Sequence, residues 1–312
     1  YDILKSLKVF TKQNIAKAPT TNTEAYEYYL RGLNIYKNSI NKQNFQIAAD
    51  FLKKALELDE YLIKARLKLG WIYDEQFHNN EKAISTFNEC LYRSKSLNDK
   101  SGLARSLNNI GNVLKQDHPD SALKYYKESL QISTEINDLW NMGRTTHNLG
   151  NHFSFHQIHG DSNKVNVGIK YFEEALTIEE SIGDYDGLCR TYWNLGQVYH
   201  GIGKSKVSMK YYHKAKDYAI DNFLYYLLDG IIVDISFEYK IQHKMSEALE
   251  VLFEYIELTG EENNSRILDN IASTYADLGE FDSAIDYYTR SLKINQKFGD
   301  KQDVGNSLHI IG

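Results

Sequence analysis

A small residue recurs along this chain at intervals of 36 to 46 residues. The eight positions are Gly32, Gly70, Gly111, Gly150, Gly196, Ser236, Ala272 and Gly312. A period of this length is typical of a solenoid in which each unit is a pair of helices that packs on its neighbours. We therefore expect one elongated repeat array, although a length of 312 residues would ordinarily suggest two domains.

Other residues keep fixed distances from these small positions. A large residue follows three positions later, as Tyr73 follows Gly70. After a variable gap come a second small residue, a large residue four positions beyond it and a third, mostly small residue after seven, as in Ala122, Tyr126 and Ser129. Spacings of three, four and seven are helical. Each unit is therefore predicted to be two helices, with small residues where the backbones approach and large residues between them.

This pattern of aromatic residue, leucine, glycine, tyrosine, alanine, aromatic residue and alanine resembles the tetratricopeptide repeat (TPR), from about residue 23 to the end. The resemblance implies an all-α fold, a right-handed α-solenoid (superhelix) of about seven TPR helix pairs plus a partial eighth. The expected repeats are about 25–62, 63–103, 104–142, 143–188, 189–228, 229–264, 265–304 and a partial 305–312. Most spacings are nearer 40 residues than the usual repeat of about 34. That resembles the longer-repeat branch, which includes kinesin light chains, polarity adaptors and bacterial peptide-sensing regulators.

The two ends depart from the repeat. Residues 1–22 are predicted to be the tail of an upstream domain or a linker helix, and Thr21 to Glu24 a capping box that opens the first repeat helix of 23–312. The segment 16–32 resembles the boundary where a TolB-like domain of bacterial regulators, often behind an adenylate or guanylate cyclase or a DNA-binding domain, passes into a repeat array. Because the last unit stops at half a helix, we expect a piece of a longer protein.

Composition limits the possible functions. A net charge of −6 argues against nucleic acid as a partner, and no apolar run is long enough for a membrane span, so no direct membrane insertion is expected. Cys90 and Cys189 are interpreted as buried free thiols. No phosphate loop, nucleophile elbow or zinc-protease motif occurs, so we expect neither an enzyme nor a cofactor. The cytoplasm is the expected compartment, or the periplasm if a membrane span lies upstream.

In the family that the chain resembles, partners lie along a concave groove lined by the first helix of each pair. At those positions the sequence repeats an arginine and an asparagine four residues apart, which places both on one helix face. The pairs are Arg105 with Asn109, Arg144 with Asn148, Arg190 with Asn194, and Arg266 with Asn270. Asn112, Asn151, His147, Trp193 and Phe237 are assigned to the same groove.

The chemistry of this ladder favours a peptide ligand. Asparagine amides can both donate to and accept from an extended backbone, and arginine can clamp a carboxylate through two hydrogen bonds. The predicted ligand is therefore an extended, acidic peptide or protein segment, with apolar anchors at the aromatic positions. The alternative is that the asparagines support neighbouring helices and the arginines are solvated.

Histidines cluster at positions 147, 152, 156 and 159, near Asp161. His152 and His156 lie one helical turn apart, but no cysteine or second histidine pair completes a site, so no metal is expected.

Three functions remain open at this point. The first is a non-catalytic interaction and scaffold module that regulates an attached signalling domain. The second is a structural dimerisation arm or spacer, with a homodimer as partner. The third is a regulatory region of a nucleotide cyclase.

Overall fold

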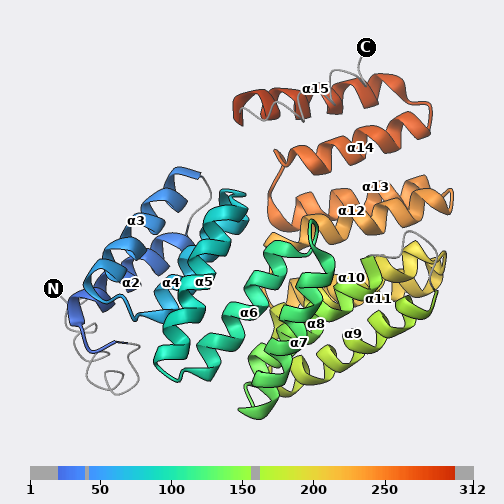
Figure 1. The fold of residues 1–312 in the computed structure, drawn as a ribbon. Helices are drawn as coiled ribbons and strands as arrows, with labels where there is room; N and C mark the ends of the chain where they lie inside the picture. The colour runs from blue at the N-terminus through green and yellow to red at the C-terminus, as the bar shows by residue number, and fades with distance from the viewer. Residues whose placement is uncertain (1–19, 39–41, 156–161, 299–312) are drawn as a thin grey trace. The chain divides into compact units, whose positions relative to one another are not determined.

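The computed structural model describes residues 20–38, 42–155 and 162–298. Within these ranges the chain forms fourteen α-helices in seven sequential pairs (Figure 1). The pairs are α2 (Thr23–Lys37) and α3 (Lys42–Leu58), α4 (Ile63–Trp71) and α5 (Asn80–Ser96), α6 (Lys100–Leu114) and α7 (Pro119–Glu135), α8 (Leu139–Phe155) and α9 (Ser162–Ile182), α10 (Tyr185–Gly201) and α11 (Ser205–Asp221), α12 (Tyr225–Ile241) and α13 (Met245–Thr259), and α14 (Ser265–Asp277) and α15 (Phe281–Phe298). A five-residue π-helix, η2 (Ile72–Gln76), continues α4. The expected all-α solenoid of about seven helix pairs is confirmed, while the predicted partial repeat at 305–312 lies outside the described residues.

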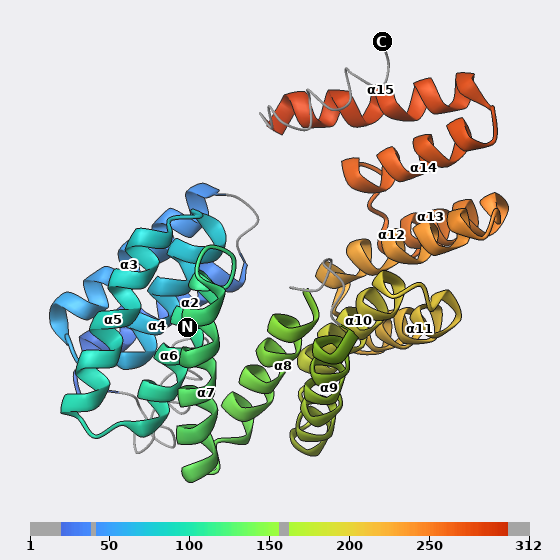
Figure 2. The same ribbon diagram turned by 45° about the vertical axis from the view of Figure 1, so that its right-hand side comes forward.

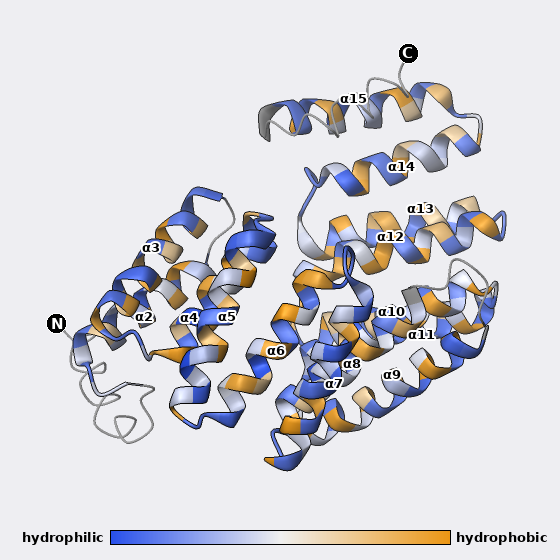
Figure 3. Ribbon diagram, viewed as in Figure 1, coloured by the Kyte–Doolittle hydropathy of each residue, from blue (hydrophilic) through white to orange (hydrophobic). Residues whose placement is uncertain are grey.

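The chain divides into two compact units, residues 1–152 and 153–312, here called unit 1 and unit 2. Unit 1 has one core that includes Leu52 of α3 and Leu62 just before α4, and a second around Phe87 of α5. The larger core of unit 2 runs from α10 to α14 and includes Leu228 and Leu252. Each helix carries both orange and blue segments in Figure 3, as expected for helices with one buried and one solvated face.

The recurring glycines lie against the large residues of the second helices. A Cβ atom added at Gly70 would lie 2.4 Å from the ring of Phe87, one at Gly111 would lie 2.6 Å from Tyr126, and one at Gly196 would lie 2.3 Å from Tyr212. These distances are far below van der Waals contact, so only glycine lets the two helices approach this closely. The predicted pairing of small and large residues is confirmed at these positions.

Five of the six joints that the structure describes between helix pairs contain a residue in the left-handed region. The residues are Asn98, Asn137, Gly183, Phe223 and Gly260, with φ of 53°, 54°, 67°, 57° and 70°. Glycine and asparagine adopt this conformation readily, whereas a bulky residue does so at a cost of about 1–2 kcal/mol. Phe223 is the one bulky residue among these five, and its side chain is 76% exposed. Its ring packs edge-on against Tyr225, with 6.2 Å between ring centroids.

The first described helix begins one residue later than the capping box predicts. Asn22, rather than Thr21, is the N-cap of α2, and its Oδ1 accepts from the backbone N–H of Ala25 at 3.0 Å. The amide of Asn22 also donates to the carbonyl of Leu58 at 3.0 Å. Because asparagine both caps α2 and ties it to the end of α3, it is favoured over the threonine. Of the segment 1–22, predicted to be the tail of an upstream domain or a linker helix, residues 1–19 lie outside the described residues.

Both cysteines are buried and free, as predicted. Burial raises the pKa of the Cys90 thiol to about 11 and that of Cys189 to about 12, so both remain protonated at neutral pH. Of the helices in the described ranges, none is both long and apolar enough to cross a membrane.

Candidate functional site

The predicted ladder residues lie on the first helices of both units. Unit 1 carries Arg105, Asn109 and Asn112 on α6, and Arg144, His147, Asn148 and Asn151 on α8; unit 2 carries Arg190, Trp193 and Asn194 on α10, Phe237 on α12, and Arg266 and Asn270 on α14. The two sets differ in the side chains that contact their arginines.

In unit 1, cationic side chains alternate with aromatic rings. The guanidinium carbon of Arg144 lies 4.4 Å from the centre of the Trp71 ring and 4.7 Å from that of Trp140. The guanidinium of Arg105 lies 4.8 Å from the Trp140 ring, and the ammonium of Lys68 lies 4.9 Å from the Trp71 ring. We call these five residues the Trp–Arg cluster. It joins α4, α6 and α8, and it keeps three positive charges over aromatic faces that attract them.

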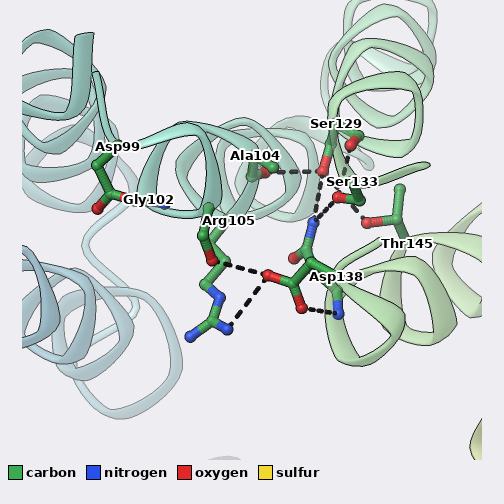
Figure 4. A network of polar contacts seen from close by, with 10 residues as sticks. Asp99, Gly102, Ala104, Arg105, Ser129, Ser133, Asp138 and Thr145 are labelled. Carbon is green, nitrogen blue, oxygen red and sulfur yellow. Dashed lines mark hydrogen bonds and ion pairs between the residues drawn. The ribbon is translucent and has the colours of Figure 1, made fainter. Parts of the chain in front are cut away.

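Arg105 is further fixed by an acid at the start of α8. Its guanidinium donates to Asp138 at 3.3 Å, and the hydroxyl of Ser101 donates to the same carboxylate oxygen at 2.7 Å (Figure 4). Burial raises the pKa of Asp138, but the bonds from Ser101, the backbone N–H of Asn141 and the charge of Arg105 outweigh it, so the pKa lies below its usual value. Asp138 therefore stays ionised and orients Arg105.

Lys68 lies in a crowded positive environment. Burial lowers the pKa of its ammonium, and the charges of Arg144 and Lys37 lower it further, while Glu75 acts in the opposite direction. A ligand carboxylate at this position would offset both the desolvation and the repulsion between Lys68 and Arg144.

A buried polar network behind the cluster holds α8 against α6 and α7. The Asn141 amide donates to the hydroxyls of Ser129 at 3.0 Å and Ser133 at 2.7 Å. Ser129 in turn donates to the carbonyl of Ala104 at 2.7 Å and lies 3.3 Å from the Thr145 hydroxyl (Figure 4). Because buried polar groups are costly when unpaired, this network favours a single arrangement of the three helices.

Several asparagines of the ladder take part in the fold. Asn109 is only 6% exposed. The amide of Asn148 donates to Asn108 at 2.9 Å, and Asn112 accepts from the hydroxyl of Tyr126 at 2.8 Å. These contacts favour the helix-supporting interpretation for the asparagines of α6 and for Asn148. His147 and Asn151 are half-buried on α8.

In unit 2, the aromatic residues of the ladder pack on the chain itself. The indole N–H of Trp193 donates to Asp234 at 2.7 Å, and its ring fills the space where a Cβ of Gly230 would stand. Phe237 is 49% exposed, and its ring packs against His200 with centroids 5.6 Å apart. Trp193 thus bridges α10 and α12, whereas Phe237 remains accessible.

The arginines of unit 2 have acidic neighbours. Arg190 pairs with Asp186 at 3.0 Å, and Arg266 lies 3.7 Å from Asp229. On α14 the amide of Asn270 donates to the backbone carbonyl of Arg266 at 2.8 Å. Asn194 is half-buried on α10. Together with Asp234, these acids make the first-helix face of unit 2 less favourable to an acidic ligand than the Trp–Arg cluster.

Sequence reasoning missed Trp140, Asn108 and Asn141. Trp140 lies in the first turn of α8, one turn ahead of Arg144. An i, i+4 spacing between an aromatic residue and an arginine was the available signal. The other two asparagines sit beside predicted core positions, where nothing in the sequence separates a packing amide from a binding one.

No group of three or more histidine, cysteine or acidic side chains that could hold a metal occurs in the part of the chain that the structure describes. His156, His159 and Asp161, which belong to the histidine cluster, lie outside it.

Comparison with known families matches two models, both described as tetratricopeptide repeat. One covers residues 61–135, and the other covers residues 190–219 and 265–298. The matched segments lie in both units and coincide with helix pairs of the observed fold. The chain contains tetratricopeptide repeats. A search of the curated proteins finds no match.

Several solved structures have a similar fold. A Rap protein complexed with competence and sporulation factor is 13% identical, with 99% of this chain and 91% of that chain covered and a TM-score of 0.63. A signal transduction ATPase with numerous domains and a tetratricopeptide repeat sensor, from Pyrococcus horikoshii, is 15% identical over 93% of this chain and 53% of that one, with a TM-score of 0.61. BtubC (BKLC) from P. vanneervenii is 14% identical, with coverage of 71% and 92% and a TM-score of 0.58. At these identities the similarity shows the fold alone.

Proposed function

We propose that this chain is a non-catalytic protein–protein interaction module that binds an extended acidic peptide or protein segment through the Trp–Arg cluster of unit 1. The observation that carries the proposal is the position of Arg144 over both Trp71 and Trp140. Tryptophan and arginine are the residues most enriched among those that dominate binding energy at protein interfaces.

The cluster combines what such a ligand needs. Guanidinium groups bind carboxylates through parallel hydrogen bonds, and rings that hold a guanidinium in place reduce the entropy lost on binding. The two indoles add apolar area beside these charges. Lys68 contributes a third positive charge whose lowered pKa an anionic ligand would raise again.

We further propose that ligand binding is relayed to an attached signalling domain. A Rap protein of this fold has been solved with competence and sporulation factor, and an ATPase of this fold uses such repeats as a sensor. The resemblance of segment 16–32 to the junction behind TolB-like domains supports the same arrangement, including a cyclase as the output. Sequencing upstream of Tyr1 tests this part directly, because an array with no adjoining output domain contradicts it.

Intrinsic fluorescence provides a direct test of ligand binding. The chain has three tryptophans, and two of them, Trp71 and Trp140, belong to the cluster. We expect a peptide of alternating Glu and Leu to bind saturably and to change tryptophan emission, and its Lys–Leu counterpart to fail. The change should persist in Trp193→Phe and vanish in a variant that replaces Trp71 and Trp140 with Phe.

Charge variants identify the residues responsible. Arg144→Gln together with Lys68→Gln should weaken binding of the acidic peptide about tenfold or more. Arg93→Gln is the matched control, because Arg93 also lies over aromatic rings, 5.1 Å from that of Tyr61, but belongs to the second helix α5. Equal affinities of the double variant and the control would overturn the proposal.

A dimerisation arm is the second candidate, favoured by exposed apolar side chains on α12. Tyr226, Phe237 and Ile241 are 62%, 49% and 50% exposed. Light scattering of the isolated chain over a wide concentration range tests this candidate. A strict monomer contradicts it, and a dimer lost on Phe237→Ser supports it.

A further inference from the structure

A cavity of about 540 Å³ opens in unit 1 between α3, α5 and the π-helix η2. Helices α3 and α5, labelled in Figure 2, are the second helices of two successive pairs, and η2 lies between α4 and α5 in the chain. The cavity shares none of its lining residues with the Trp–Arg cluster. Its volume falls in the range of about 300–1,000 Å³ typical of small-molecule sites.

Lysines supply the charge of this cavity. Lys42 and Lys53 come from α3 and Lys82 from α5, and none of the described residues that line the cavity is acidic. Lys53 pairs with Asp50 at the rim, at 2.9 Å, but this aspartate is 58% exposed. Ion pairs so exposed contribute little, so an incoming anion could replace Asp50 at small cost.

Aromatic side chains form an apolar wall beside the lysines. Tyr73 and Phe77 line the cavity with their ring centroids 6.2 Å apart, and the ammonium of Lys82 lies 5.8 Å from the Tyr73 ring. Both rings belong to the irregular end of the helix. The N–H of Phe77 bonds to the carbonyl of Ile72, five residues back, which is the π-helical pattern. Such wide turns are frequent at functional sites because they redirect side chains out of helical register.

The charged side chains of this cavity suit a phosphate group better than a carboxylate. An ammonium group is a compact charge that suits phosphate, whereas the planar fork of arginine matches carboxylate, and the cavity has three lysines and no arginine among its described lining residues. The amide of Gln46, which donates to the exposed Asp50 at 2.9 Å, can turn to an anion in the same way as Lys53. A free phosphate ion would leave most of the volume and the aromatic wall unused, so the ligand needs an organic part.

We propose that this cavity binds a small organic phosphate, with its phosphates against Lys42, Lys53 and Lys82 and its organic part against Tyr73 and Phe77. This ligand is distinct in size and chemistry from the acidic segment proposed for the Trp–Arg cluster. Binding here also connects two successive helix pairs, so it stabilises their packing by mass action.

Calorimetric titration of the whole chain with three probes tests the proposal. Pyrophosphate represents the charged part of the proposed ligand and adenosine its organic part. ADP contains both parts. We expect ADP to bind about tenfold more tightly than pyrophosphate, adenosine to give no heat, and both anions to weaken as salt is raised. Absence of saturable binding by either anion at millimolar concentration would overturn the proposal, and equal affinities of the two anions would overturn the role of the aromatic wall.

Variants locate the site. Lys42→Gln with Lys82→Gln should weaken both anions about tenfold or more. Both side chains are exposed, and retention of the circular dichroism spectrum and melting temperature verifies that the fold is intact. Lys54→Gln is the matched control. Lys54 is an exposed lysine of α3, the helix that carries Lys42, but it pairs with Glu57 and does not line the cavity. An unchanged affinity in the double variant contradicts the assignment.

Phe77→Leu tests the contact with the organic part of the ligand separately from the contact with its phosphates. It should lower the affinity for ADP while leaving that for pyrophosphate unchanged. An equal loss for both anions would indicate a general disturbance and contradict the proposed contact.

Discussion

The guanidinium carbon of Arg144 lies 4.4 Å from the centre of the Trp71 ring, although Trp71 belongs to the second helix pair and Arg144 to the fourth. The two residues therefore meet past α6, the first helix of the pair that separates them in the chain. Their contact lies on the first-helix face of unit 1. A ligand there must lie over this contact or open it.

The first prediction concerns the energy of this contact. A double-mutant cycle of Trp71→Leu and Arg144→Gln, measured by urea unfolding, should give a coupling energy of about 0.5–1 kcal/mol, the usual range for a cation–π pair at an exposed site. The cycle is needed because either single change also removes other contacts. A coupling energy of zero would show that the two side chains do not interact in solution.

The second prediction concerns the glycines against aromatic rings. Gly196→Ala should destabilise the fold by about 1–3 kcal/mol, because its Cβ would lie 2.3 Å from the buried ring of Tyr212. Gly201→Ala is the control in the same helix. Its Cβ would meet nothing within 4 Å, so the better helix former should stabilise by up to about 1 kcal/mol. Thermal and urea unfolding measure both, and changes of the same sign would contradict the packing described.

How much of this structure the sequence predicts depends on the kind of residue. Gly70, Gly111 and Gly196 are predictable because a repeat fixes which residues touch, and the distances to their aromatic partners confirm it. The site is harder, because Asn148 and Asn108 bond to each other although only Asn148 was assigned to a ligand. An amide that binds a helix and one that binds a peptide have the same spacing and polarity. The contact between Trp71 and Arg144 joins two helix pairs that are not consecutive, and residue spacing does not show which side chains of such pairs meet.

The third prediction concerns pH. Burial raises the pKa of Glu179 to about 8, with smaller contributions from Asp184 and Asp186, while its ordinary value is 4.5. The folded state therefore holds a proton that the unfolded state releases between these values, so the free energy of unfolding falls as pH rises from 4.5 to 8 and then levels off. At about 1.4 kcal/mol per pKa unit, the rise from 4.5 to about 8 sets an upper limit of about 5 kcal/mol on this loss.

Glu179→Gln isolates this effect. The variant should lose most of the decline in stability between pH 5 and pH 8, as measured by urea unfolding at several pH values. Glu180→Gln, which changes the exposed neighbour on the same helix, should keep the wild-type profile. A decline of the same size in both variants would show that other groups cause it.

The fourth prediction concerns Phe223. Asparagine holds the left-handed position in two other joints, so Phe223→Asn should raise the free energy of unfolding by about 0.5–1 kcal/mol. The reverse change, Asn98→Phe, should lower it by a similar amount. A loss of stability in Phe223→Asn would mean that the contact of Phe223 with Tyr225 is worth more than the backbone strain.

The left-handed residues at Asn98 and Asn137 also allow a whole helix pair to be deleted or duplicated. Because one residue carries the chain reversal, the segment that follows Asn98 and ends at Asn137 can be deleted or duplicated, and the new junction again places an asparagine in front of a first helix. Neither edit requires a new backbone conformation at the splice. The number of helix pairs, and with it the length of the surface available to a partner, can therefore be set in whole steps.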